Sequence, residues 1–130
     1  MILAIKTDNP TAELVLLDRG GEVLERETWL AERRLALELL SRLEALLIQH
    51  GASWKALTGL IVYEGPGSFT GLRIGITVMN TISYSRNIPI VGQTGDEWSE
   101  IGVKRLLANE NDRIVMPAYG APARITQPRK

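Results

Sequence analysis

Apolar residues form short continuous runs in several parts of the chain. Residues 2–5 and 60–63 contain only apolar side chains, and residues 88–91 are apolar apart from a proline. Continuous apolar runs of this length are typical of strands that are buried on both faces of a sheet. The pattern therefore predicts three buried strands.

Two further strands are predicted between the first two of these runs. Residues 11–17 follow Asn9-Pro10, a turn signal, and residues 18–21 supply the two glycines of a second turn. Residues 22–29 then alternate loosely and carry several charges. We expect a three-stranded antiparallel meander whose third strand lies at the edge of the sheet.

Three segments have the composition of helices. Residues 31–50 contain no Gly or Pro and are rich in Leu, Ala, Glu and Arg, with Gly51 placed to end the helix. Residues 70–86 follow a glycine-rich loop, and residues 96–107 begin at Asp96, a suitable N-cap.

The predicted order is β-β-β-α-β-α-β-α, which describes an α/β fold with a mixed sheet covered by helices. An antiparallel meander followed by β-α units matches one lobe of the actin-like ATPase and ribonuclease-H-like architecture. We assign residues 1–108 to this lobe. Residues 109–130 begin with a polar stretch and contain three prolines after Val115, so they are expected to form a linker and an extended tail.

Composition limits the function further. The chain has 130 residues, of which 45% are hydrophobic, as expected for one globular domain. Its 15 basic and 15 acidic residues cancel, so no overall field attracts nucleic-acid phosphates, although a local basic patch stays open. We expect no strong autonomous binding of tRNA.

Metal and membrane chemistry are also disfavoured. The chain has no cysteine and one histidine, His50, which removes thiol nucleophiles, disulfides and the usual zinc sites. The apolar start at residues 1–5 meets Lys6 too soon for a signal peptide or a membrane span. We expect a cytoplasmic protein with no metal and no cofactor.

A glycine-rich loop joins the strand at 60–63 to the helix at 70–86. It comprises Gly65, Pro66, Gly67, Ser68, Phe69, Thr70 and Gly71. Gly71 is followed by Leu72 and Arg73, not by Lys and Ser or Thr, and Thr70 stands at the third glycine position of the dinucleotide fingerprint. Neither nucleotide motif is satisfied.

The loop has two readings. In the structural one, Gly65 and Gly67 make the turn, Ser68 or Thr70 caps the helix, and Gly71 with Gly75 lets another element approach the helix closely. In the functional one, the start of the helix contacts a phosphate. Spacing favours the structural reading and leaves phosphate contact or interface use open.

The first helix has more apolar surface than one sheet can cover. Its polar residues leave an apolar arc of about 200°, so a surplus stripe is available for a partner. We assign this interface to Leu35, Leu39, Leu43 and Leu46, with Ala36, Leu40 and Leu47 facing the core. The second helix contributes Ile74, Val78 and Ile82, and Arg42 and Arg73 lie at the rim.

The run GPGSFTGLRIG at residues 65–75 resembles the signature segment of the TsaB (YeaZ) family almost letter for letter. The similarity extends over about residues 1–108. The chain departs from the family pattern in having Lys6-Thr7 where Asp-Thr is usual, and in holding little of the family's second lobe. Residues 115–119 weakly resemble the family's C-terminal P-x-Y segment.

The resemblance implies a non-catalytic scaffold in tRNA threonylcarbamoyladenosine (t6A) modification, with no catalytic residue of its own. It implies binding to the catalytic subunit TsaD through the two apolar helices, with a TsaE-like ATPase as a further component and a homodimer when the chain is alone.

Two alternatives belong to other classes. One is a nucleotide-binding enzyme with the actin-like fold, an ATPase or kinase relative, for which Glu64 is the only well-placed carboxylate. The other is a homodimeric interaction protein with a different partner.

Overall fold

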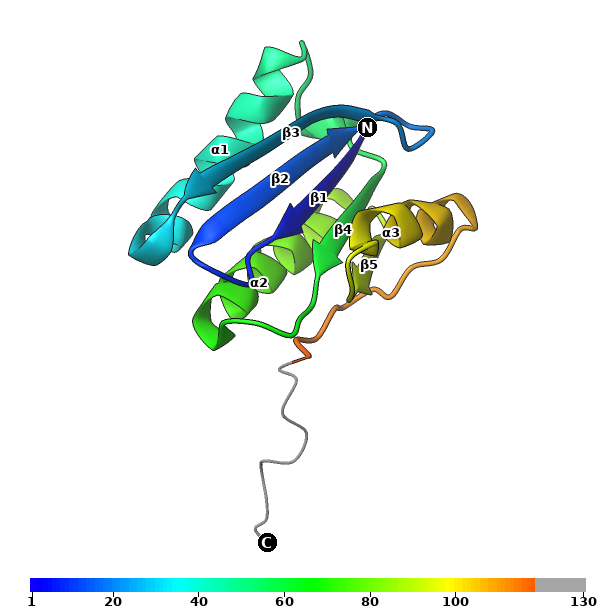
Figure 1. Ribbon diagram of the computed structural model, residues 1–130. Helices are drawn as coiled ribbons and strands as arrows, with labels where there is room; N and C mark the ends of the chain where they lie inside the picture. Colours follow the sequence, from blue (N-terminus) through cyan, green and yellow to red (C-terminus); the bar gives the residue numbers. More distant parts are fainter. Residues whose placement is uncertain (119–130) are drawn as a thin grey trace, which may run out of the picture.

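Five strands form one mixed sheet in the order β3-β2-β1-β4-β5 (Figure 1). The computed structural model describes residues 1–118, so the end of the predicted tail, with Tyr119, lies outside the described residues. In chain order the elements are β1 (Ile2–Lys6), β2 (Thr11–Leu17), β3 (Val23–Leu30), η1 (Glu32–Arg34), α1 (Leu35–Gln49), η2 (Trp54–Ala56), β4 (Gly59–Tyr63), α2 (Phe69–Arg86), β5 (Ile90–Gln93) and α3 (Trp98–Leu107). The predicted order of strands and helices is confirmed.

The sheet is antiparallel on one side of β1 and parallel on the other. Ile2 of β1 lies opposite Leu17 of β2, whereas Leu3 lies opposite Leu60 of the parallel strand β4. Parallel neighbours need crossover helices, and α1 and α2 supply them. The carboxyl ends of β1, β4 and β5 therefore meet at one edge of the sheet.

Helices cover the sheet from both sides. Figure 1 shows α1 and α2 behind the sheet and α3 in front of β4 and β5. Gly75 of α2 lies against Ile5 of β1, and Gly102 of α3 lies against Ile61 of β4. Because β1 and β4 are sandwiched in this way, their apolar residues are almost fully buried, as their continuous apolar runs predict.

Strand β3 is the edge strand, as its charges predict. Most of its residues are exposed or half-exposed, and only Trp29 is buried. The other edge, β5, is covered by the chain that follows α3. The side chains of Asn111 and Asp112 accept hydrogen bonds from the backbone N–H groups of Ile90 and Gly92 at 3.1 and 2.9 Å.

Residues 112–115 are also tied to α2. The side-chain amide of Asn80 donates to the carbonyl of Val115 and accepts from its N–H group, both at 3.0 Å. The amide thus imitates a peptide partner, and the Val115 side chain is buried. The polar stretch that the sequence indicated as a linker is therefore hydrogen-bonded to β5, and the residues after it are bonded to α2 and to Glu64, whose carbonyl accepts from the N–H of Ala118 at 2.6 Å.

Several element boundaries differ from prediction. Helix α1 begins at Leu35, after the short helix η1, and not at residue 31. The last strand begins at Ile90, after Pro89, and α3 begins at Trp98 with Glu97, not Asp96, as its N-cap. Gly95 has a positive φ of 89°, which keeps Asp96 in the turn before the helix. Gly51 has a φ of 68° just after α1, as predicted for a helix end.

Candidate functional site

The glycine loop after β4 packs tightly against the end of β1. A Cβ atom on Gly67 would lie 2.4 Å from Cβ of Asp8, and one on Gly65 would lie 1.9 Å from the carbonyl oxygen of Ala118. Gly65 also has a φ of 128°, a backbone conformation that residues other than glycine rarely adopt. Both glycines are therefore required by backbone geometry.

The next two glycines let α2 approach β1. A Cβ atom on Gly71 would lie 2.4 Å from the carbonyl oxygen of Thr7, and one on Gly75 would lie 2.3 Å from Thr7 Oγ1. Thr7 is buried, and its hydroxyl donates to the carbonyl of Gly71 at 2.8 Å. The structural reading of this glycine spacing is confirmed.

Capping of α2 differs from the prediction. Ser68 is the N-cap residue, but its side chain makes no capping hydrogen bond. Its backbone N–H instead donates to the carbonyl of Asp8 at 2.7 Å. Thr70 is an exposed residue of the first turn, so neither hydroxyl caps the helix.

A lysine lies at the carboxyl end of β1. The ammonium of Lys6 is 2.8 Å from Oδ2 of Asp8 and 4.4 Å from the centre of the Tyr63 ring. A fixed cation at this edge opposes the binding of a divalent metal there. Among residues 1–118, no three His, Cys, Asp or Glu side chains lie close enough together to hold a metal ion.

A second charged cluster lies at the ends of β4 and β5. The guanidinium of Arg105 on α3 forms a hydrogen-bonded ion pair with the carboxylate of Asp112. It also donates hydrogen bonds to the carboxylate of Glu110 at 2.7 Å and to the carbonyl of Gly92 at 2.9 Å. Burial raises the pKa of Asp112, but the hydrogen bonds from Arg105 and Gly92 outweigh it and hold that pKa below its usual value. This cluster fastens α3 and residues 110–112 to the edge of β5.

Glu64 lies beside this cluster, and within residues 1–118 its carboxylate makes no hydrogen bond or ion pair, although its backbone bonds Gln93 and Ala118. Burial, and then the neighbouring carboxylate of Asp112, raise the pKa of Glu64, and the charge of Arg105 only partly opposes them. A raised pKa in the fold means that the ionised carboxylate destabilises the native state at neutral pH.

We therefore expect Glu64→Gln to stabilise the fold at pH 7, by less than about 1 kcal/mol because the carboxyl is partly hydrated. The gain should shrink as the pH falls through the raised pKa, since the native Glu64 then takes up its proton. Thermal melts between pH 7 and pH 4 measure this. Asp112→Asn is the control of opposite sign and should destabilise the fold at pH 7. The pKa of Asp112 is lowered in the fold, so its carboxylate stabilises the fold at pH values above the pKa of the unfolded chain, and this stability is lost as the pH falls through the folded pKa. A Glu64→Gln variant less stable than the wild type at pH 7 would contradict the assignment.

The predicted partner stripe on α1 is wrong. Leu35, Leu39, Leu43 and Leu46 are all buried against the domain, at 4%, 0%, 0% and 1% exposure. Leu40, expected in the core, is 54% exposed, and Leu37 is 77% exposed. Leu47 is buried, as expected. The helix is rotated relative to the prediction.

Contacts with β3 set this rotation. Trp29 Nε1 donates to Glu38 at 3.1 Å, and the guanidinium of Arg42 lies 4.7 Å from the centre of the Trp29 ring. Arg42 also pairs with Glu27 at 3.3 Å. These contacts turn the Glu38–Arg42 side of the helix toward β3, so the leucines beside it face the sheet. Arg42 therefore belongs to a contact within the domain.

Ala36 of α1 lines a concavity together with Ile74, Thr77 and Val78 of α2. Leu37 and Leu40 are exposed next to Ala36 and one turn after it, so we group these residues as one largely apolar surface. We call it the α1–α2 face and define it by Ala36, Leu37 and Leu40 on α1 and Ile74, Thr77 and Val78 on α2. Ile74 and Val78 are partly exposed there and Arg73 is exposed, whereas the predicted Ile82 is buried.

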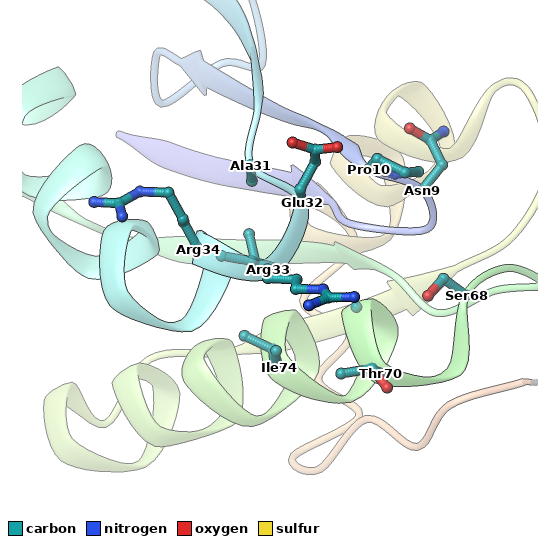
Figure 2. A pocket seen from close by; sticks show the side chains of 11 residues that line it. Asn9, Pro10, Ala31, Glu32, Arg33, Arg34, Ser68, Thr70 and Ile74 are labelled. Carbon is teal, nitrogen blue, oxygen red and sulfur yellow. The ribbon is translucent and has the colours of Figure 1, made fainter.

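The surface between the two helices is concave. A cavity of about 370 Å³ lies between them, and its lining includes Ala36, Arg73, Ile74 and Val78. A larger cavity of about 780 Å³ adjoins it, shares Thr70 and Ile74 with it, and extends to η1 and the turn between β1 and β2 (Figure 2). The sequence indicated surplus apolar area on these helices, but it did not indicate this second cavity.

The antiparallel meander, the β-α units and the glycine loop after β4 define one lobe of the actin-like class. Comparison with known proteins gives the family. A family model described as TsaD, tRNA N6-adenosine threonylcarbamoyltransferase, matches residues 29–93, half of the chain. The chain belongs to the TsaB (YeaZ) family, within the group of proteins that this model describes.

Relatives of this family are similar over most of the chain. The tRNA threonylcarbamoyladenosine biosynthesis protein TsaB of Bacillus subtilis is 35% identical over 68% of this chain and 38% of its own length. TsaB of Escherichia coli is 29% identical over 87% of this chain and 51% of its own length. Among solved structures, YeaZ from Pseudomonas aeruginosa superposes with a TM-score of 0.65 at 28% identity, over 72% of this chain and 43% of that one.

The chain thus spans between about two fifths and half of the length of these TsaB relatives. None of the helices in residues 1–118 is both long enough and apolar enough to span a membrane.

Proposed function

We propose that this chain is a non-catalytic subunit in t6A modification of tRNA, and that its α1–α2 face binds the TsaD-like catalytic subunit. Membership of the TsaB (YeaZ) family supports a role in t6A biosynthesis. In this proposal residues 1–108 are the binding lobe, the protein acts in the cytoplasm, and a TsaE-like ATPase joins the complex without contacting a nucleotide site on this chain.

The observation that carries the proposal is the apolar area of the α1–α2 face. Leu37 and Leu40 are 77% and 54% exposed although they lie next to each other on one helix, and Ile74 and Val78 continue the surface on α2. Burying four such side chains contributes about 1.5–3 kcal/mol each before the costs of association, enough for micromolar or tighter binding. In the absence of the partner, the same face is expected to pair with a second copy.

The edge of the sheet supports the non-catalytic part of the proposal. Lys6 holds Asp8 in an ion pair at the carboxyl end of β1, where a Mg-nucleotide enzyme of this fold class would need a free carboxylate. The glycines of the loop are used for packing against β1, as their distances to Thr7 and Asp8 demonstrate.

The test is co-expression with the threonylcarbamoyltransferase of the same genome, followed by sizing of the complex. Leu37→Glu is expected to reduce complex formation at least tenfold, because the carboxylate would be buried without a partner. Leu107→Glu is the matched control, since Leu107 is 55% exposed on α3, on the other side of the sheet. Equal loss in both variants, or no complex with the wild type, would contradict the proposal.

A further inference from the structure

The larger cavity beside the α1–α2 face is lined on one side by η1 and on the other by the start of α2. In Figure 2 the Arg33 side chain extends from η1 across the cavity toward the Thr70 end of α2, while Glu32 and Arg34 point away from it. Arg33 is therefore the charged side chain that enters this space. We call this space the Arg33 cleft.

Arg33 differs from its neighbours in that its guanidinium has no partner among residues 1–118. Arg34 bonds Glu38 at 2.9 Å and Arg42 bonds Glu27 at 3.3 Å. Within residues 1–118, the guanidinium of Arg33 makes no ion pair or hydrogen bond with any side chain or carbonyl. Its charge is available to something outside the chain.

The backbone that carries Arg33 is held in place. The N–H groups of Ala31 and Glu32 both donate to the carbonyl of Pro10, at 2.9 and 3.1 Å, which ties η1 to the turn between β1 and β2. Glu32 has a φ of 46°, an uncommon conformation for a residue other than glycine. A guanidinium on a fixed backbone loses less freedom on binding than one on a mobile loop.

The side chain that enters the cleft is cationic, and α2 adds no acidic residue near it. The first turns of α2 carry Arg73. Glu32, the one acidic residue that lines the cleft, points away from it. An acidic group on a partner would therefore meet attraction and no competing carboxylate.

The cleft and the α1–α2 face are continuous, since both cavities are lined by Thr70 and Ile74. A helix laid with its apolar side on the α1–α2 face would place one of its ends over the cleft. We infer that the occupant is an amphipathic helix of a partner protein, with an acidic side chain near that end which pairs with Arg33. This deepens the proposed function, on which the choice of the α1–α2 face rests.

A second copy of the chain fits this surface less well. On a second copy, Glu44 is exposed on α1 and Glu32 on η1 points away from the cleft, against the two arginines Arg33 and Arg73. Self-association therefore leaves an arginine unpaired at each end of a two-fold interface. The Arg33 cleft favours a different protein over a second copy.

The direct test uses two labelled synthetic peptides, each an 18-residue amphipathic helix with one leucine stripe. One carries three glutamates at its first turn, and the other carries three lysines there. The full chain is expected to bind the glutamate peptide about tenfold more tightly at low salt, with the preference reduced at high salt. Arg33→Gln should remove most of this preference.

Arg34→Gln is the matched control, because it removes the same charge from the same turn, at a guanidinium that points away from the cleft and pairs with Glu38. A glutamate preference that survives in Arg33→Gln, or falls equally in both variants, would overturn the inference, and so would the absence of any preference in the wild type. The peptides separate this inference from the proposed function. If the chain prefers the glutamate peptide but does not bind the transferase, the cleft stands and the assigned partner is wrong.

The same pair of variants is then compared on the transferase complex. Arg33→Gln is expected to weaken it about three- to tenfold while Arg34→Gln leaves it within twofold, and Arg33→Lys should recover only part of the loss since lysine lacks the bidentate fork. Free phosphate at millimolar concentration should not change the peptide preference. Competition by phosphate would identify the cleft as a site for small anions and overturn its assignment to a protein.

Discussion

Replacing Leu43 by Glu is expected to abolish cooperative unfolding of the domain, whereas the same change at Leu40 should leave the fold intact. Leu43 is fully buried and Leu40 is 54% exposed, although both lie on α1 only three residues apart. A buried, unpaired carboxylate costs several kcal/mol in addition to about 2–5 kcal/mol for the lost leucine packing. The sum approaches the whole stability of a small domain, which is about 5–15 kcal/mol.

Circular dichroism melts and the soluble yield measure this difference. Leu40→Glu should change the free energy of unfolding by about 0.5 kcal/mol or less, and it should lower the self-association of the wild type in sedimentation at micromolar concentration. A Leu43→Glu variant with a native melt would show that α1 is rotated differently from the contacts described above.

Replacing Gly75 by Ala is expected to destabilise the domain by about 2–3 kcal/mol, although alanine is ordinarily the better helix former. The added methyl group would lie 2.3 Å from Thr7 Oγ1 and 3.2 Å from Ile5 Cδ1, both in the packed interface of α2 with β1. Because Thr7, the residue directly after β1, and Gly75 on α2 are both buried, neither side can move away freely.

A double-mutant cycle with Thr7→Ala tests the cause. Thr7→Ala alone should cost about 1–2 kcal/mol, since it removes the hydrogen bond to the carbonyl of Gly71. It also removes the atoms that the new methyl group meets, so the double variant should be more stable than the sum of the single effects predicts. Additive effects in urea unfolding would show that the clash with Thr7 is not what makes Gly75 necessary.

The fold was predictable from the sequence because each element has a local signal that tertiary packing reinforces. Strands β1 and β4 have continuous apolar runs because helices cover both of their faces. Strand β3 has charges because it lies at the edge. The glycine spacing at Gly71 and Gly75 predicted a close approach to α2, and Thr7 provides the element that approaches.

The rotation of α1 was not predictable, because two neighbouring stripes of the helix are equally apolar. Periodicity identifies an apolar arc but does not say which part of an arc of about 200° faces the sheet. That choice depends on Glu38 and Arg42, whose contacts with Trp29 and Glu27 join residues 9 to 15 positions apart in the chain. No pattern in the sequence shows such pairings.

The Arg33 cleft could not be predicted from the sequence for a similar reason. In the sequence, Arg33 and Arg34 are two adjacent charges before a helix, a pattern typical of a solvated turn. Their difference arises in three dimensions, because Glu38 satisfies Arg34 and the tie between η1 and Pro10 leaves Arg33 beside α2. Whether an arginine is paired within the fold or is available to a binding partner can be decided only from its neighbours in three dimensions.

The charged side chains of the edge strand β3 also affect whether two copies of the protein can pair through their sheets. Two copies of β3 joined edge to edge in antiparallel fashion, with the register centred on Arg26, would place Arg26 against Arg26 and Glu25 against Glu27. Registers centred on Glu25 or Glu27 place a glutamate against its own copy. Like charges thus oppose the pairing of β3 with its own copy in these registers. Pairing of β3 with β3 would in any case join only two sheets, because residues 111–112 cover β5 at the other edge.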